Sequence, residues 1–548
     1  GDPDEALYSA VWVQRPGPAW REVHGLSAIA YQTRFNELSG QGFAPVLVSA
    51  TGPANQAIFI ALFEKGVTRP WYARHNLRWD PVTDPDTITH ENQRAFDQGF
   101  IPRCLAVYGI PDDRRFAGIW VKNQKSIPWA WWWSDSTTYQ RFVDAEVLAG
   151  VRPAYVSVAP DGWILSVFRD EPIGEWWARH NLTGADYQTE FDIRVAAGLM
   201  PIMVQAGGAR NATRYASIFA HNDEPLHWQW MTTGNTFSGS SHMDRTIRTF
   251  MTEHSIRAGS VAVARKGHIL ASRGYTWAEP NYPVTQPATL FRIASLSKMF
   301  TAAAIDRLVA VGRLTWNTPA FDLLGISSAL LASQTPDSRV ISITIRQLVL
   351  RLSGLARDFD TDLRGIASKL GIITTPTRDS LVRYLYGNSS LLHPMGIHDV
   401  FVAATSVGSR KLHEVSSYDN PGIQLSKIDV ATNKYAPNAY GGDFVLESGE
   451  GVGGLLTSAP SLARFIAQHA VWNVGKREKN LTRHGTLDGT CAGAFSRGDG
   501  LDVAYLFNRR VSENEHDGIT AAIKDVRLVA FLAKHIGFFN YIRLSPMS

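Results

Sequence analysis

Apolar and polar positions in the first 230 residues follow a pattern that occurs four times. Each copy has a segment with helical spacing, then a glycine, an apolar run with a proline near its start, and a second apolar run. Short apolar runs bounded by turn residues predict strands, and the second strand of each copy is expected at 58–63, 116–120, 163–168 and 215–219. The pattern predicts an array of four helix–strand–strand units, repeated at about 50 residues.

Residues shared by the units refine this prediction. The helical segments align as Tyr31-Gln32, Tyr139-Gln140 and Tyr187-Gln188, with Asn92-Gln93 as the equivalent in the second copy. Proline cannot donate to a strand ladder, so a proline in every first strand predicts an edge or strand-start position; these are Pro45, Pro102, Pro153 and Pro201. The segment 8–12 resembles a second strand with no helix before it. Such a spare strand could pair with the last unit and close a ring, which would remove exposed edges.

A Trp-x-x-x-His-x-Leu motif heads three of the units, at Trp20, Trp71 and Trp176. Aromatic residues that recur at one repeat position favour an inter-repeat core. The histidines occur once per repeat and lack metal spacing, so structural hydrogen-bonding roles are expected. The run 129–133 holds four tryptophans in five residues, which cannot all face one core. An aromatic surface for a polymer, such as a glycan or an extended peptide, is therefore an open alternative there.

The pattern changes after a polar Gly/Ser segment. An amphipathic helix is expected at 243–254 and a strand hairpin at 260–275. The sequence thus predicts an α+β chain: a Trp-rich tandem-repeat domain for target binding at 1–235, a linker at 236–242, and a second domain at 243–548 that carries the chemistry.

The second domain contains Ser295-Leu-Ser-Lys298 at the start of a long Ala-rich helix. Residues i and i+3 share a helix face, so the lysine amine can reach the serine hydroxyl. A buried lysine with a lowered pKa can take that proton, and a helix N-terminus favours negative charge beside it. Ser295 and Lys298 are therefore the candidate nucleophile and base.

In this context the second domain resembles the serine β-lactamase and penicillin-binding-protein superfamily. The resemblance covers about residues 243–540, and beyond Ser295 and Lys298 it rests on several ordered segments, at 343–355, 453–465, 483–490, 504–510 and 519–536. It implies a β-lactamase-like α/β serine hydrolase fold. It also implies that the residue after the glycine of the third motif supplies a backbone N–H to the oxyanion hole.

That third motif corresponds to Arg483-His-Gly485-Thr486 in this sequence. Carried over, the oxyanion donors are the amides of Ser295 and Thr486, on a strand that lines the substrate cleft. Arg483 replaces the family's usual Lys or His and keeps a cation that could orient a carboxylate or carbonyl. A surface salt bridge is the other interpretation of Arg483.

The family's second motif, a Tyr-x-Asn or Ser-x-Asn that supplies an acid/base, fits poorly. The two matches are Tyr386-Gly-Asn388 and Tyr418-Asp-Asn420, and neither lies in the expected order relative to His393-Pro-Met-Gly. The simplest explanation is that a stretch of tens of residues is missing near 386–392. Tyr386 and Tyr418 are kept as candidates for the acid/base.

Composition and charge exclude several classes. The formal net charge is +4 and no block of Lys or Arg occurs, which gives no case for nucleic acid. No apolar run is long enough for a membrane helix, and the first residues lack a signal-peptide pattern and could be a processed terminus. Cys104 and Cys491 allow at most one bridge, and two buried thiols are the simpler expectation. Four glycosylation sequons would permit secretion, at Asn181, Asn211, Asn388 and Asn480.

Taken together, the repeat domain and the hydrolase domain resemble the fungal polyglycine hydrolases. That resemblance implies a secreted, extracellular, monomeric serine endopeptidase that cuts glycine–glycine bonds in the linkers of plant chitinases, with no metal or cofactor. Two other functions stay open. One is another acyl hydrolase on the same fold, such as an esterase, a D-aminopeptidase or a β-lactamase. The other is a binding protein on a degraded hydrolase fold.

Overall fold

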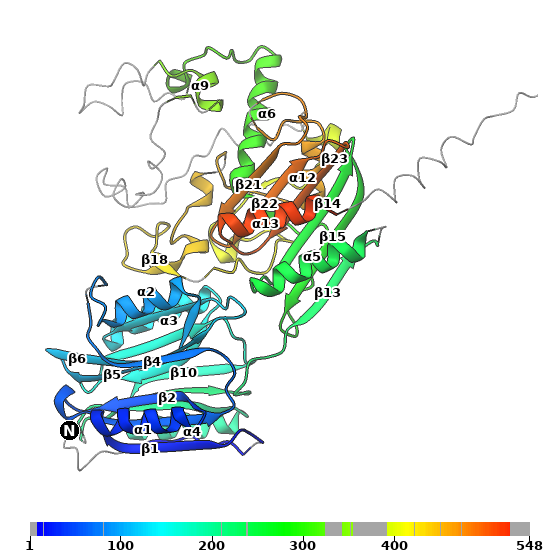
Figure 1. Cartoon of the computed structure of the whole chain (residues 1–548). Coiled ribbons are helices and arrows are strands. Elements are labelled where there is room, and N and C mark those ends of the chain that lie inside the picture. The colour runs from blue at the N-terminus through cyan, green and yellow to red at the C-terminus, as the bar shows by residue number, and fades with distance from the viewer. Residues whose placement is uncertain are drawn as a thin grey trace, which may run out of the picture. The chain divides into compact units, whose positions relative to one another are not determined.

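A computed structural model describes residues 8–14, 16–80, 82–209, 211–236, 239–323, 342–350, 352–353, 392–420, 422–449, 451–472 and 474–526. The chain divides into two compact units (Figure 1). Unit 1 comprises Gly1–His227 with Pro421–Ile423, and unit 2 comprises Trp228–Asn420 with Gln424–Ser548. Among the described residues, no helix has the length and apolar character needed to cross a membrane.

Unit 1 contains four antiparallel three-stranded sheets, one for each repeat. In every sheet the last strand of the repeat is central, so the order is first, third, second. The strands are β1 (Trp20–Ser27), β3 (Ile58–Lys65) and β2 (Phe43–Thr51); β4 (Trp71–Leu77), β6 (Asp113–Lys122) and β5 (Phe100–Ile110); β7 (Trp129–Ser134), β9 (Ile164–Arg169) and β8 (Arg152–Val158); β10 (Trp176–Leu182), β12 (Arg214–Ala220) and β11 (Met200–Gly207). The helices are α1 (Ala28–Gly40), α2 (Ile88–Asp97), α3 (Ser136–Leu148) and α4 (Gly184–Ala196), with a short η2 (Ala54–Gln56).

The predicted strand pairs and helices are present, but each repeat has one more strand than expected. The Trp-x-x-x-His-x-Leu motif is itself the first strand, so each repeat has the order strand–helix–strand–strand. In β4 a bulge between Arg74 and Leu77 lets His75 face α1 while Leu77 enters the buried core. The recurrent proline lies in an edge strand of each sheet, as predicted, and a register shift follows it in every repeat.

The helix starts correct the alignment of the second repeat. The N-cap residues are Ser27, Thr87, Asp135 and Thr183, and each side chain accepts a hydrogen bond from the first turn. Counted from these caps, the position of Tyr31, Tyr139 and Tyr187 is taken in α2 by Glu91, not by Asn92. Glu91 is fully buried and forms ion pairs with Arg74 and Arg94.

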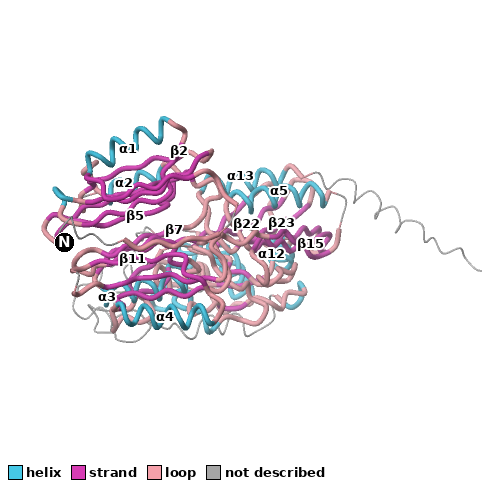
Figure 2. The backbone as a smooth tube through the Cα atoms, turned by 90° about the horizontal axis from the view of Figure 1, so that it is seen from below, coloured by secondary structure: helices cyan, strands magenta, loops and turns pink. Residues whose placement is uncertain are grey.

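The four sheets meet through their second strands. The Tyr155 hydroxyl of β8 donates to the Val48 carbonyl of β2 at 3.0 Å, and the Val107 amide of β5 donates to the Ser157 hydroxyl of β8 at 3.1 Å. Ser49 of β2 and Gln205 of β11 join the first and last repeats at 3.5 Å. In Figure 2 the strands β2, β5 and β11 lie between α1 and α2 on one side and α3 and α4 on the other.

The predicted closing strand at 8–12 is not formed: the segment makes no strand pairing with any described residue. Instead, its rings contact the first strand of the first repeat. The Tyr8 ring meets the His24 ring edge-on at 5.5 Å, and the Trp12 and Trp20 rings are 5.5 Å apart. In the later repeats the helix of the preceding repeat makes the equivalent contact, as in the edge-on Tyr31–His75 pair at 5.6 Å. The segment therefore takes the place of a missing helix.

Unit 2 is built on a six-stranded sheet with the order β13-β15-β14-β23-β22-β21. Alternate residues of β14 separate two cores. Ala262 packs with Phe300 and Leu462, and Val261 packs with Met251 and Ile519. Helices therefore cover both faces. The elements of this layer structure are β13 (Gln229–Gly234), β14 (Ala258–Arg265), β15 (His268–Ala278), β21 (Thr482–Leu487), β22 (Thr490–Ser496) and β23 (Leu501–Phe507), with α6 (Ser297–Ala310) and α12 (Ala459–Ile466) on one face and α5 (Ser240–Glu253) and α13 (Glu513–Lys524) on the other.

Shorter elements complete the described part of this unit. They are β16 (Phe291–Arg292), β17 (Phe401–Val402), β18 (Ile423–Leu425), β19 (Tyr435–Pro437), β20 (Leu455–Thr457), α7 (Ala320–Leu323), α9 (Ile345–Val349), η3 (Ala294–Leu296), η5 (His393–Met395), η6 (Val407–Ser409), η7 (Asn438–Tyr440) and η8 (Leu446–Ser448).

The division between the units lies earlier than the sequence suggested. Unit 2 begins at Trp228, and β13 pairs with β15 in its sheet, where Trp230 stacks on Tyr275 at 5.7 Å. The helix α5 begins at Ser240, inside the expected linker 236–242. The polar composition of that segment thus marks the start of a helix and not the domain boundary.

The two cysteines are separate buried thiols. Cys104 lies in the core of unit 1 and Cys491 in a core of unit 2, and both are free. Burial raises the pKa of Cys104 to about 11 and raises the pKa of Cys491 further. Neither thiol is therefore poised as a nucleophile at neutral pH.

Candidate active site

Ser295 lies in η3, directly before α6. The turn is held by β20, because the Ile293 amide donates to the Leu455 carbonyl at 3.0 Å and the Leu455 amide donates to the Ser297 hydroxyl at 3.1 Å. Ala294, immediately before the serine, has φ of 47°. A positive φ is costly for a residue with a Cβ and persists only where the surroundings impose it. The sharp turn presents Ser295 at the N-terminal end of α6.

Lys298 reaches the serine as the sequence spacing predicted. Its Nζ is 2.9 Å from the Ser295 Oγ and 2.8 Å from the Val452 carbonyl oxygen. The Thr301 hydroxyl donates to the neighbouring Gly451 carbonyl at 2.8 Å, which ties the same loop to α6. A neutral amine here can direct one N–H to Val452 and its lone pair to the serine hydroxyl. This is the geometry of a base that activates a nucleophile.

The strand β21 passes against the nucleophile turn at Gly485. A Cβ built on this glycine would lie 2.3 Å from the Ile293 carbonyl oxygen and 3.3 Å from the Ala294 Cβ. Only glycine allows this approach, which is the physical reason for the residue in the motif. The following amide, that of Thr486, belongs to the same stretch of backbone. The structure thus brings Ser295, Lys298 and Gly485 together.

Arg483 has a different environment from the one expected. Its side chain is buried, its guanidinium donates to the Val471 carbonyl at 3.1 Å, and it lies 4.8 Å from the centre of the Trp472 ring. The expected role, presenting a cation to the substrate, is not supported by this placement. An arginine guanidinium stacks well on an aromatic ring, which accounts for the interior position.

Tyr418 also differs from expectation. Its hydroxyl donates to Glu414 Oε1 at 2.8 Å and accepts from the Arg292 amide at 3.1 Å. Burial and the Glu414 charge hold the pKa of this phenol well above its usual range. The hydroxyl is occupied by structural bonds, so the placement does not support an acid/base role. Tyr386, the other candidate, and the sequon at Asn388 lie outside the described residues.

Arg292 is a feature that the motif search did not single out. It is almost fully buried, and its guanidinium donates to the carbonyls of Ala404 and Ala439. The same group lies 3.9 Å from the Tyr418 ring centre and 5.3 Å from that of Tyr440. Arg292 therefore ties two loops to the strand that leads into the nucleophile turn. A charged residue within the apolar run 290–296 was the available signal.

A family model for beta-lactamases matches residues 243–532, which is more than half of the chain. The chain belongs to the beta-lactamase family. A second model, described as a polyglycine hydrolase-like structural repeat, matches 17–66, 68–123 and 173–222. These are the first, second and fourth units of the array. The expected combination of polyglycine hydrolase-like repeats and a β-lactamase-like serine hydrolase domain is thus confirmed.

Similarity to individual proteins is more limited. The Protein flp of Staphylococcus aureus (strain N315) is 26% identical over 128 residues, which is 23% of this chain and 25% of the relative. The chain thus spans about a quarter of the length of the curated relatives it matches.

Several solved structures are similar to about half of this chain. A class C beta-lactamase from Rhodobacter sphaeroides is 15% identical, with 54% of this chain and 99% of that chain covered and a TM-score of 0.33. A D-alanine carboxypeptidase from Burkholderia cenocepacia is 13% identical, with 52% and 98% covered and a TM-score of 0.33. At these scores the likeness carries no argument about the site.

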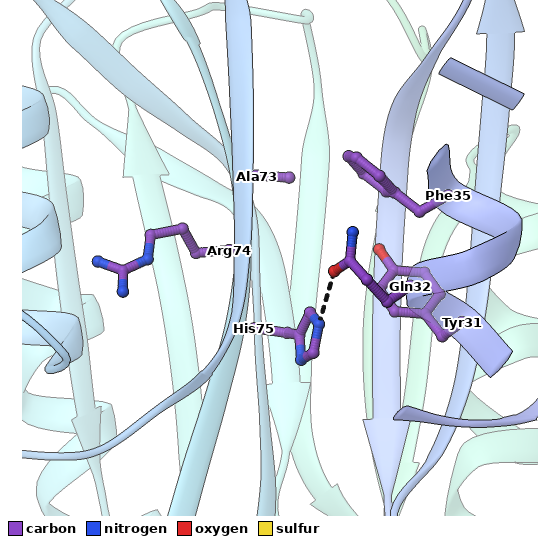
Figure 3. Close-up of a pocket in the computed structure, with 6 residues that line it drawn as sticks. All are labelled: Tyr31, Gln32, Phe35, Ala73, Arg74 and His75. Carbon is purple, nitrogen blue, oxygen red and sulfur yellow. Dashed lines mark hydrogen bonds between the residues drawn. The ribbon is translucent and has the colours of Figure 1, made fainter. Parts of the chain in front are cut away.

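Unit 1 contains a cavity between its first and second repeats. The side chains that line this cavity pack the two repeats together. The cavity, about 230 Å³, lies between α1 and β4 and is lined by Tyr31, Gln32, Phe35, Ala73, Arg74 and His75 (Figure 3). The His75 Nε2 is 3.0 Å from the Gln32 Oε1, while Arg74 points to the other side of the strand, where it binds Glu91 and Asp86. The expected structural role of the repeat histidine is confirmed here.

The tryptophan run 129–133 forms β7, the first strand of the third repeat, and its side chains have separate packing roles. Trp132 faces its own helix, where its Nε1–H donates to Glu146 at 2.7 Å and its ring stacks on Phe142. Trp133 occupies the position that His75 and His180 have in the neighbouring repeats, and it packs against rings at 4.4–5.6 Å: Trp79, Phe116 and Trp163. The second repeat lacks the helix tyrosine, so a larger ring fills the seam. Packing against the core of unit 1 accounts for Trp131, Trp132 and Trp133, while Trp129 meets the exposed Phe96 ring at 6.4 Å.

The described sequons Asn181, Asn211 and Asn480 are exposed. Within the described ranges, no group of three His, Cys, Asp or Glu side chains is placed to hold a metal ion.

Proposed function

We propose that this chain is a secreted, extracellular serine endopeptidase that cleaves glycine–glycine bonds in the linker of another protein. The observation that carries the proposal is the 2.9 Å contact between Ser295 Oγ and Lys298 Nζ beside Gly485, in a chain that also has polyglycine hydrolase-like repeats. The serine hydrolase class follows from the family. The peptidase activity and the linker substrate are the proposed steps.

The proposed reaction uses the groups described above. Lys298 takes the hydroxyl proton, and the Ser295 oxygen attacks the glycine carbonyl carbon. The carbonyl oxygen becomes an anion, stabilised by the amides of Ser295 and Thr486. When the anion collapses, the peptide C–N bond breaks and Lys298 returns the proton to the leaving amine. Water then attacks the acyl-enzyme by the same sequence and releases the carboxylate.

A glycine linker gives a protease little to read, because it has no side chains. Recognition must use backbone hydrogen bonds and exclusion of anything larger than hydrogen at the substrate α-carbons. Affinity then has to come from a structured part of the target. We assign that binding to unit 1, the array of four repeats. The proposed target is a plant chitinase, and the proposed active form of the chain is a monomer. Exposed sequons support passage through a secretory pathway.

The first test is covalent labelling of the full chain with a fluorophosphonate. Ser295→Ala should abolish labelling with an unchanged circular dichroism spectrum, and Lys298→Met should slow labelling by about 100-fold or more, the usual contribution of a general base. Ser406→Ala is the matched control, because that serine is exposed and its side chain caps no helix. Absence of labelling in the unaltered chain would reject the enzyme and leave a binding protein.

The second test separates peptidase from esterase. Two folded domains joined by a polyglycine linker are incubated with the chain, beside nitrophenyl acetate and a β-lactam. Mass spectrometry should show cuts between glycines, and none in a matched linker of alanine and serine. Hydrolysis of the ester or the β-lactam alone would reject the peptidase and support another acyl hydrolase on this fold.

A further inference from the structure

The strand β21, which packs against the turn 293–295 on one face, contacts α13 along its other face. Side chains of alternate residues of β21 form hydrogen bonds with every fourth residue of the helix. The three rungs are Thr482–Lys524 at 2.7 Å, His484–Thr520 at 2.9 Å and Thr486–His516 at 3.4 Å. We call these contacts the β21–α13 ladder.

The ladder stays in register because the two periods nearly match. Two strand residues advance about 6.7 Å, and four helix residues advance about 6.0 Å. Three rungs can therefore form before the mismatch exceeds a side chain's reach. Among the strands that the structure describes, β21 is the edge of its sheet and pairs with β22 alone. The helix supplies the other constraint on its position.

The contacts of the middle rung fit one tautomer of His484. The Thr520 hydroxyl donates to the His516 carbonyl at 2.8 Å, which leaves its oxygen to accept. It is 2.5 Å from the Tyr505 hydroxyl and 2.9 Å from the His484 Nε2. We assign the proton of His484 to Nε2 on this basis. At the next rung, the Thr486 hydroxyl can donate to the His516 Nδ1 only while that nitrogen carries no proton.

The two imidazole rings are stacked, with centroids 4.0 Å apart and planes 15° from parallel. A proton on either ring places a positive charge against the other. Burial and then the charge of His484 lower the pKa of His516 to about 3, and burial lowers that of His484 as well. Other ionisable groups around the pair are Tyr505 on β23, Cys491 on β22, and Glu515, Asp517 and Lys524 on α13.

We propose that His484 and His516 are positioning residues that hold the Thr486 amide beside Ser295 only while both rings are neutral, so that acid loosens β21 and slows acyl transfer. Protonation of His516 reverses the Thr486 contact, because the Nδ1–H then donates to the Thr486 oxygen, and it places a positive charge against His484 in the stack. Protonation of His484 puts a proton on its Nδ1, which lies 3.5 Å from Asp517 Oδ1, and likewise puts a charge in the stack. Both changes act on the face of β21 opposite Gly485. The inference rests on the proposed acyl transfer.

The test replaces each ring by an amide that keeps its hydrogen bond at every pH. In His516→Asn the amide oxygen can accept at the place of Nδ1, and in His484→Gln the amide nitrogen can donate at the place of Nε2. The rate of Ser295 labelling by a fluorophosphonate is measured from pH 4 to 8 for the full chain and the double variant, each normalised to its own plateau. His469→Gln is the control, because this histidine also has a pKa lowered by burial and lies outside the ladder.

Protonation of Lys298 lowers the labelling rate in every variant, and the ladder adds a second loss in the unaltered chain. We therefore expect the acid limb of the labelling profile to be shallower in the double variant, with a relative rate about tenfold higher at the acid end. His469→Gln should leave the limb in place. An unmoved limb in the double variant, or an equal movement in His469→Gln, overturns the proposal.

A second measurement keeps this outcome separate from the proposed function. Hydrogen exchange of amides 482–487, corrected for the intrinsic effect of pH, should show protection falling with acid in the unaltered chain and holding in the double variant. If the chain is never labelled but protection behaves this way, the hydrolase proposal fails and the ladder stands. If protection is independent of pH in both proteins, the ladder proposal fails.

Discussion

Gly485 and Ile293 are in contact through backbone alone: a Cβ on the glycine would come within 2.3 Å of the isoleucine carbonyl oxygen. Two segments nearly two hundred residues apart thereby fix each other. One presents Ser295, the proposed nucleophile, and the other presents the amide proposed to bind the oxyanion. Since both are main chain, neither can yield by a rotamer change.

Gly485→Ala should therefore lower acyl transfer by about 100-fold or more, the usual effect of losing one oxyanion donor, because the methyl group pushes β21 from the turn. The rate of fluorophosphonate labelling measures this, with the melting temperature recorded alongside. Gly408→Ala is the control, because nothing lies within 4 Å of a Cβ at that position. Unchanged labelling in Gly485→Ala would mean that the strand does not set the site.

Tyr418→Phe should reduce stability and not chemistry. The change removes the hydroxyl that links Glu414 to the Arg292 amide, which leaves a buried N–H without its acceptor and costs about 1–3 kcal/mol. Urea unfolding measures the free energy of unfolding, and labelling at neutral pH measures the site. A large loss of labelling with unchanged stability would restore Tyr418 as the acid/base.

Trp133→Ala should destabilise the repeat unit by about 3–5 kcal/mol, because the ring fills the seam between the second and third repeats. Calorimetry of the full chain would show a lower transition temperature for unit 1 while labelling of Ser295 is retained. Trp177→Ala, at a ring that is 39% exposed, is the milder comparison. Equal effects of the two changes would contradict the packing role of Trp133.

Stability should fall with acid in a window set by His516. The pKa of this histidine is lowered in the fold to about 3, while an unfolded chain takes up the proton near its usual pKa of about 6.5. The stability is thus fully present above pH 6.5 and is lost as the pH falls toward 3, by up to about 1.4 kcal/mol per pH unit. In His516→Asn, urea unfolding between pH 7 and 4.5 should show a shallower slope. His268→Gln, at an exposed hairpin turn, should keep the original slope.

Features encoded locally could be predicted from the sequence. The apolar runs gave the second strand of each repeat, and the spacing of Ser295 and Lys298 on one helix face gave their contact. The first strand of each repeat was also visible in principle. Trp71 and His75 lie at even spacing, as on one face of a strand, but a bulge before Leu77 breaks the alternation, and the motif was taken as a marker ahead of a helix.

Features decided by tertiary packing could not be predicted. Arg483 and Gly485 lie on one face of a strand, yet only the neighbouring Trp472 determines where the guanidinium goes. Tyr418 matched the Tyr-x-Asn motif in sequence, but in the structure its hydroxyl accepts a hydrogen bond from the Arg292 amide. Glu91 was missed because Gln93 and Phe96 match the Gln and Phe of the other repeats by sequence, while the N-cap at Thr87 places the helix one residue earlier.

The contacts of Tyr8 and Trp12 have a practical consequence for protein production. The match to the repeat family begins at residue 17, which invites expression of a shortened chain from that point. Such a chain would lack both rings and would expose more of the aromatic face of β1, where Trp20 is already 48% exposed. Exposed apolar patches promote association between molecules. A soluble preparation should therefore start upstream of Tyr8.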